Sequence, residues 1–133
     1  MEKKDLKPAG VFKYFEEICQ VPRPSKKEEK IIAYLKAFGA KHNLETKVDE
    51  AGNVLIKKPA TPGKENLQTV VLQSHIDMVC EKNNDVQHDF LTDPIETEID
   101  GEWLKAKGTT LGADNGIGVA TEQAILADDR IEH

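Results

Sequence analysis

Long apolar runs are missing from this sequence, and so is a leader-like N-terminus. No uninterrupted apolar stretch approaches the roughly 20 residues that are needed to span a bilayer. The first residues, 1–5, are mostly charged, and no apolar stretch follows that could form the core of a signal peptide. We therefore expect a cytoplasmic protein.

Cysteine is scarce. The two cysteines, Cys19 and Cys80, are too few for a disulfide framework. Each has apolar neighbours in the sequence, so we expect both to be reduced residues of the packed interior. A functional thiol or a bridge between them is the less favoured alternative.

An excess of positive charge is absent as well. The chain has 18 Lys and Arg against 24 Asp and Glu, a net charge of −6, and no basic cluster. Nucleic acids and anionic membranes attract basic surfaces, so neither is expected as a partner. With 38% hydrophobic and 32% charged residues, the 133-residue chain has the composition of a soluble globular domain.

Helical and strand patterns alternate along the chain. Apolar residues at helical spacing predict three helices, over residues 10–20, from Ser25 to about residue 42, and over residues 116–127. Ser25 and Glu28 have the spacing of a capping box, which predicts that the second helix starts at Ser25.

Five short segments have the character of strands. They are residues 45–49, 53–57, 69–74, 95–99 and 102–106. The segment 69–74 is almost entirely β-branched or apolar, which predicts a buried central strand. Asp100-Gly101 separates the last two segments and is a pair typical of hairpin turns. Strands interleaved with helices predict an α/β layered domain.

The first candidate site residues, His75 and Asp77, directly follow the predicted central strand. Residues i and i+2 of an extended chain point to the same side, so both side chains face one site. One imidazole nitrogen of His75 is then free for a metal, while Asp77 accepts from the other ring N–H. Taken alone, a His-x-Asp pair is more often structural or solvated than metal-binding.

Asp114 lies in a second unusual segment, with Gly112, Gly116 and Gly118 around it. Glycines allow tight backbone conformations just before the third helix. Spacing alone leaves open whether Asp114 or its neighbour Asn115 simply caps that helix. A phosphate-binding loop is not favoured, because no lysine follows the glycines at the required position.

Together the two segments are more specific than either alone. Residues 72–79 (LQSHIDMV) and 108–116 (GTTLGADNG) closely resemble the aminoacyl-histidine dipeptidases, which are metallopeptidases of the di-zinc aminoacylase and carboxypeptidase superfamily. Residues 18–25 (ICQVPRPS) are also similar to the opening of that family. The resemblance implies a three-layer α/β/α catalytic domain, of which residues 1–133 would be the N-terminal part.

The resemblance also implies roles for the candidate residues. His75 would be a terminal ligand of one zinc ion, Asp77 would orient His75 and tune the catalytic site, and Asp114 would bridge two zinc ions. The peptide bond after Asp114 would be cis. Two zinc ions, with manganese or cobalt as alternatives, would polarise the carbonyl of a small peptide substrate and activate a water.

Several parts that the family uses are not found in this chain. The family has a Glu-Glu pair, a further carboxylate ligand and a late histidine downstream of the bridging acid. The pairs Glu16-Glu17 and Glu28-Glu29 lie on predicted helices, where we expect solvated faces. His42, His88 and His133 are not expected to bind metal. The resemblance therefore implies that this chain is inactive alone, and that the full-length protein forms a homodimer through a lid domain absent here.

Three alternatives remain at this point. The chain could come from another hydrolase of the superfamily, namely a tripeptidase, an aminoacylase or a deacylase. It could come from a non-catalytic, peptide-binding homologue. It could also be a globular domain in which His75 and Asp114 have structural roles only.

Overall fold

Three α-helices and two β-hairpins make up the fold, and the computed structural model describes all residues from Met1 to His133. In chain order the elements are η1 (Lys3–Asp5), α1 (Ala9–Cys19), α2 (Glu29–Lys41), β1 (Glu45–Val48), β2 (Val54–Lys57), β3 (Thr97–Asp100), β4 (Trp103–Ala106) and α3 (Ala113–Ala127). The predicted α/β class is confirmed. None of these helices is both long enough and apolar enough to cross a membrane.

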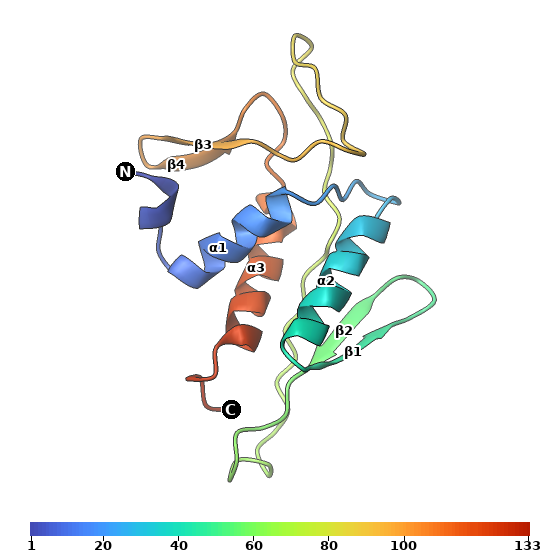
Figure 1. Cartoon of the computed structure of the whole chain (residues 1–133), viewed down its shortest axis with the longest axis vertical. Coiled ribbons are helices and arrows are strands. Elements are labelled where there is room, and N and C mark those ends of the chain that lie inside the picture. The colour runs from blue at the N-terminus through green and yellow to red at the C-terminus, as the bar shows by residue number, and fades with distance from the viewer.

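The core lies where α1 and α3 cross, with α2 alongside (Figure 1). Phe15 and Ile18 of α1 are buried there, as is Ile31 of α2, and α3 adds Val119 and Ala120. Burying an aliphatic or aromatic side chain of this size stabilises a fold by about 1.5–3 kcal/mol. This packing fixes the start of α3, where Asp114 lies.

The second helix begins later than the sequence predicted. Ser25 does not cap it: α2 starts at Glu29, and its N-cap residue, Glu28, makes no side-chain cap hydrogen bond. Lys26 has a φ of 69°, which is incompatible with a helix through that residue. The Ser25 hydroxyl instead donates to the carboxylate of Asp77, so a tertiary contact replaces the predicted local one.

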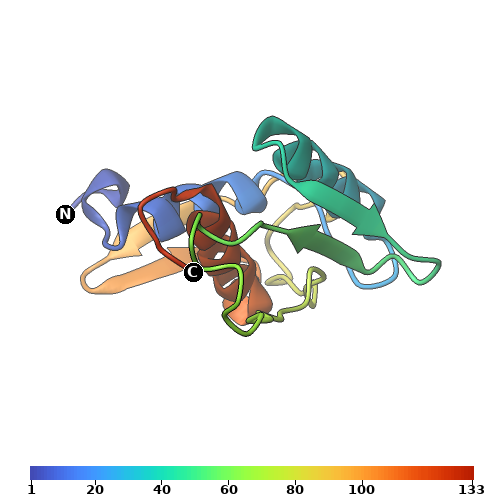
Figure 2. The ribbon, with the colours of Figure 1, turned by 90° about the horizontal axis from the view of Figure 1, so that it is seen from below.

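Four of the five predicted strands form, and they pair as two hairpins, of which the sequence predicted the second. β1 pairs antiparallel with β2, and β3 with β4. In the second hairpin Asp100 pairs with Trp103, so the two-residue turn is Gly101-Glu102 rather than Asp100-Gly101. Gly101 has a φ of 61°, a conformation that favours glycine. The hairpins lie at opposite ends of the molecule, one beside α1 and the other beside α2 (Figure 2).

The predicted buried central strand is wrong for this chain. Residues 68–77, which we call the extended segment, run most of the length of the molecule but pair with no strand (Figure 1). Val70 is 78% exposed and Val71 is 79% exposed. A β-branched run is buried only when neighbouring strands and helices cover it, and none of the four strands in this chain does so.

The glutamates of α1 are not the solvated face that the sequence predicted. Thr97 Oγ1 donates to Glu16 at 2.7 Å, and the Tyr34 hydroxyl donates to Glu17 at 2.7 Å. Both glutamates are half-buried and fasten α1 to its neighbours. The prediction for the cysteines is confirmed: Cys19 and Cys80 are unpaired, and burial raises the pKa of the Cys19 thiol to about 12.

Candidate functional site

His75, Asp77 and Asp114 lie together, although His75 and Asp114 are 39 residues apart in the chain. The distance from His75 Nδ1 to Asp77 Oδ1 is 3.0 Å, and that from His75 Nε2 to Asp114 Oδ1 is also 3.0 Å. The hydrogen bond to Asp114, and to a smaller extent that to Asp77, raises the pKa of His75. One imidazole is therefore held between two carboxylates, as the i, i+2 argument predicted for Asp77.

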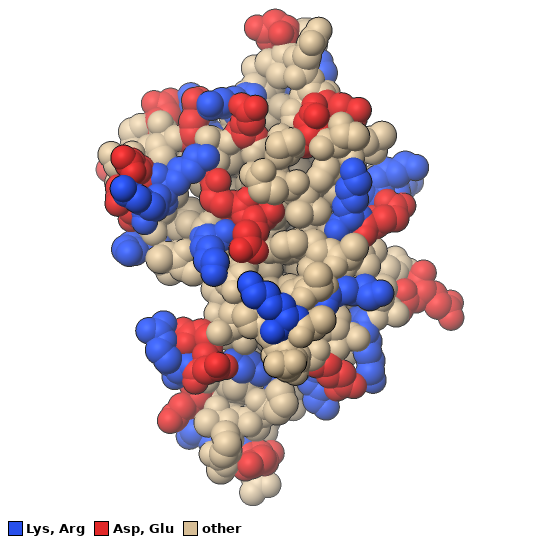
Figure 3. All heavy atoms as spheres, viewed as in Figure 1, with Lys and Arg blue, Asp and Glu red and all other residues tan.

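The site is open to solvent. The side chain of His75 is 52% exposed, that of Asp77 is 34% exposed and that of Asp114 is 96% exposed. A ligand or ion could therefore reach Asp114 without any rearrangement of the core. On the face of the molecule shown in Figure 3, acidic and basic side chains are intermixed and form no extended basic patch.

The backbone before α3 explains how Asp114 reaches His75. Gly112 has a φ of 78°, and Asp114 and Asn115 have non-helical φ and ψ angles. Asn115 Oδ1 accepts from the N–H of Gly118 at 3.2 Å, so Asn115 and not Asp114 caps the regular part of the helix. The carboxylate of Asp114 is left free to face His75. The Asp114–Asn115 peptide bond is cis, as the resemblance implied.

Asp77 is held from the other side by a segment that our sequence reasoning missed. Ser25 Oγ donates to Asp77 Oδ2 at 2.5 Å, and this hydrogen bond, together with the one from His75, lowers the pKa of Asp77. Arg23 lies next to it and donates to the carbonyls of Ile76 and Asp77. Residues 18–25 contributed to the family resemblance, but nothing in the sequence pointed to a role for Arg23 at this site.

The donor chemistry fits part of a zinc site. Zinc takes imidazole nitrogens and carboxylate oxygens, which His75 and Asp114 offer, and a carboxylate on the second ring nitrogen is usual for a metal-bound histidine. No group of three or more His, Cys, Asp and Glu side chains is arranged to hold a metal ion. A catalytic zinc generally has three protein ligands, so this chain offers an incomplete set.

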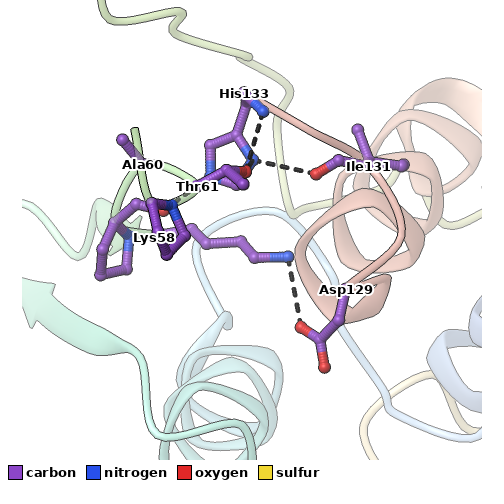
Figure 4. A pocket seen from close by; sticks show the side chains of 8 residues that line it. Lys58, Ala60, Thr61, Asp129, Ile131 and His133 are labelled. Atoms are coloured by element: carbon purple, nitrogen blue, oxygen red, sulfur yellow. Dashed lines mark hydrogen bonds and ion pairs between the residues drawn. The ribbon is translucent and has the colours of Figure 1, made fainter. Parts of the chain in front are cut away.

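The other histidines lie away from this site. The ring of His42 packs on Phe38, with 4.6 Å between ring centroids, and that of His88 packs on Phe90 at 4.5 Å. His133 Nε2 donates to the carbonyl of Pro59 at 2.7 Å. Both residues line a pocket of about 190 Å³, where Figure 4 shows the His133 ring beside Thr61 and Lys58 reaching toward Asp129.

Comparison with known proteins identifies close relatives. No family model matches the chain. It is 50% identical over 132 residues to the cytosol non-specific dipeptidase of Escherichia coli (strain K12), which covers 99% of this chain and 27% of that protein. It is 53% identical to the aminoacylhistidine dipeptidase from Vibrio alginolyticus, whose crystal structure superposes with a TM-score of 0.95 over 100% of this chain and 27% of that one. The resemblance to the aminoacyl-histidine dipeptidases is confirmed.

The chain therefore spans about a quarter of the length of the dipeptidases that it matches. A tripeptidase from Staphylococcus aureus also superposes, with a TM-score of 0.74 over 93% of this chain and 33% of that one, but at 21% sequence identity. That similarity shows a shared fold and nothing about substrate.

Proposed function

We propose that the protein carrying this chain is a metal-dependent dipeptidase and that His75 and Asp114 are two of its metal ligands. The main support is the identity of 50% and 53% to two dipeptidases over essentially the whole chain. The second support is the 3.0 Å approach of His75 Nε2 to Asp114, on an open surface and with Asp77 on the other ring nitrogen.

Each residue has a defined task in this proposal. His75 offers Nε2 to the metal, and Asp77 holds Nδ1–H and so fixes the tautomer. Asp114 offers both carboxylate oxygens, because Asn115 takes the capping role. Two zinc ions, or manganese or cobalt in their place, would polarise the scissile carbonyl and lower the pKa of a water.

The set of metal ligands within this chain is incomplete. Two protein ligands are too few for a catalytic zinc. The ring nitrogens of His75 contact only Asp77 and Asp114, and no glutamate is hydrogen-bonded to this trio to serve as a general base. We infer that the remaining ligands and the base come from parts of the protein outside these 133 residues. The chain alone should therefore be inactive. Homodimerisation through a further domain and a cytosolic location are part of the same proposal.

The proposed substrates are dipeptides, including aminoacyl-histidine dipeptides. One of the two related dipeptidases is named non-specific and the other aminoacylhistidine, so the range of dipeptides hydrolysed is the property to measure. Assays of the complete protein on aminoacyl-histidine dipeptides, other dipeptides, tripeptides and N-acyl amino acids would decide it. Hydrolysis of N-acyl amino acids or tripeptides alone would point to an aminoacylase, a deacylase or a tripeptidase instead.

Metal analysis tests the ligand assignment directly. Zinc content of the complete protein should fall in the His75→Ala variant and stay unchanged in a His88→Ala control, because His88 packs on Phe90 away from the site. Unchanged zinc in His75→Ala would leave His75 with a structural role. Zinc binding without hydrolysis of any peptide would favour a non-catalytic, peptide-binding protein.

A further inference from the structure

One arginine is buried without an acidic partner. Arg23, in the loop between α1 and α2, is only 2% exposed and takes part in no ion pair. Burial lowers the pKa of its guanidinium. Removing a charge from water is costly unless hydrogen bonds replace the lost solvation. The contacts that Arg23 makes must therefore offset that cost, and they are all to backbone carbonyls.

Those carbonyls belong to the two segments that carry the candidate ligands. Arg23 Nη1 donates to the carbonyl oxygens of Ile76, at 3.3 Å, and Asp77, at 3.2 Å. Nη2 donates to the carbonyl oxygen of Gly112 at 2.6 Å. The guanidinium thus bridges the residues that follow His75 to the residue that stands two before Asp114. Its N–H groups point in fixed directions from one plane, so it holds its acceptors at a fixed separation.

The backbone around the guanidinium is closely fitted to it. A Cβ atom placed on Gly112 would lie 2.5 Å from Arg23 Nη2, and one placed on Gly116 would lie 2.6 Å from it. Both distances are shorter than a van der Waals contact, so a side chain at either position would require the guanidinium of Arg23 to leave its acceptors. Two of the glycines that frame Asp114 in the sequence are therefore explained by the space that Arg23 occupies.

The neighbours of Arg23 reinforce the same connection. The N–H of Met78 donates to the carbonyl of Arg23 at 3.0 Å, and Pro24 forms a parallel β-bridge with Met78. Ser25 Oγ donates to Asp77, whose other oxygen faces His75. Residues 23–25 therefore hold the end of the extended segment by backbone and side chain together.

We infer that Arg23 is a positioning residue that sets the separation between His75 and Asp114. It touches neither side chain, and it acts by fixing the two backbone segments from behind the site. The consequence for metal binding rests on the proposed function. Loss of groups that orient metal ligands typically costs 10–100-fold in metal affinity, and a similar loss is expected here.

The test compares three variants. Arg23→Gln removes the guanidinium that joins the two backbone segments. Arg23→Lys keeps the positive charge but has a single ammonium group in place of the planar guanidinium with its several N–H donors. Phe38→Leu is a matched control for lost stability, because Phe38 is buried against Tyr14 in the core and not at the site. Arg23→Lys also keeps the test decisive if Arg23→Gln does not fold.

The first measurement needs no metal. In the 133-residue chain, nuclear Overhauser contacts between the His75 ring and the Asp114 β-protons should be present in the wild type and in Phe38→Leu. They should be lost in Arg23→Gln and weakened in Arg23→Lys. Full retention of these contacts in both Arg23 variants would overturn the inference, whether or not the protein binds metal.

The second measurement is zinc affinity of the complete protein. The Kd for zinc should rise about 10–100-fold in Arg23→Gln, less in Arg23→Lys, and not in Phe38→Leu. Equal Kd values in the Arg23 variants and in Phe38→Leu would overturn the role of Arg23 in metal binding. Absence of zinc binding in the wild type would overturn the proposed function, and the Overhauser contacts would still decide whether Arg23 sets the geometry.

Discussion

The two segments that carry the candidate ligands are held in place in different ways. Asp114 lies at the start of α3, a helix that packs along α1 and contributes buried residues to the core. His75 lies near the end of the extended segment, in which residues 68–77 make no backbone–backbone hydrogen bond at all. One half of the site is thus built into the core. The other half depends on a few side-chain and loop contacts: those from residues 23–25, that with Asp114, and the hydrogen bond from Ser74 to Glu122.

The order of this site comes mainly from the core helix α3. A segment without backbone partners opens at little cost in free energy, whereas a core helix opens only with much of the fold. The Asp114 half is therefore preorganised within this chain. The His75 half is pinned at one end and needs covering neighbours along its length to become a buried strand.

The largest expected difference between the extended segment and α3 is in the rate of backbone amide hydrogen exchange. Backbone amides of residues 69–75 should exchange at close to the rate of an unstructured peptide. Those of residues 119–124 in α3 should be slower by a factor of at least about 100, because they open only with the helix. The measurement is amide exchange by NMR on a dilute sample of the 133-residue chain.

Similar protection in both segments would contradict this comparison. Dilution serves as the control, because pairing between copies of the chain would protect residues 69–75 at high concentration only. Protection that persists on dilution would mean that the extended segment has a partner within the chain.

A substitution at Gly116, in α3, should lower the stability of the ordered part of the site. A Cβ there would meet Arg23 Nη2 at 2.6 Å and Phe15 Cε1 at 3.1 Å. Overpacking of this kind costs about 1–3 kcal/mol, so the free energy of unfolding of Gly116→Ala should fall by that amount. Urea unfolding measures it. The control is Gly10→Ala, whose Cβ would meet only Ala124 Cβ at an ordinary 3.6 Å and which should not destabilise.

A substitution on the extended segment should act on association rather than on folding. Val70 and Val71 expose apolar side chains beside unpaired backbone groups, which makes the isolated chain prone to pair with a second copy. Val71→Lys should raise the Kd of self-association by roughly tenfold, about 1.4 kcal/mol. The free energy of unfolding should change by less than about 0.5 kcal/mol, since the side chain is exposed.

Sedimentation equilibrium and urea unfolding separate these two effects. The matched control is Trp103→Lys, which places the same charge on another apolar residue that is 75% exposed. Its association should equal that of the wild type. Weaker association in both variants would mean that charge alone, and not the extended segment, governs pairing.

The same contrast separates what the sequence could predict from what it could not. The helices and the strands of both hairpins follow from local spacing of apolar residues, and His75 and Asp77 face one site because extended chains alternate. The burial of residues 69–74 did not follow, because burial depends on neighbours that this chain does not contain.

Partners far apart in the sequence account for the other errors. Ser25 matched a capping box, but its hydroxyl bonds to Asp77, 52 residues away. The glutamates of α1 were predicted to be solvated, but they accept hydrogen bonds from Thr97 and Tyr34. The role of Arg23 could not be predicted from the sequence, because its acceptors are backbone carbonyls, which every residue has. The prediction that His75 and Asp114 lie together came from the family resemblance and not from their spacing in the sequence.

The smallest expected effect concerns a hydrogen bond that joins the extended segment to α3. Ser74 Oγ, in the extended segment, donates to Glu122 Oε2 in α3 at 2.9 Å. Burial raises the pKa of Glu122 above its ordinary 4.5, and the hydrogen bond from Ser74 offsets part of that rise. The folded state therefore binds the proton of Glu122 more tightly than the unfolded state does. Stability from this residue is highest below the unfolded pKa and falls as pH rises through the folded pKa.

Glu122→Gln removes this pH dependence while keeping an acceptor for Ser74. At pH 7 the variant should be more stable than the wild type, by no more than the roughly 0.5 kcal/mol that is usual for a substitution outside the core. Near pH 4 the two should be nearly equal. Urea unfolding at both pH values measures the difference. Glu50→Gln, at an exposed position of the β1–β2 turn, makes the same change in net charge and should show no such gain. A gain at pH 7 in both variants would assign the effect to net charge, and a loss in Glu122→Gln would mean that the ionised carboxylate stabilises the link between the segments.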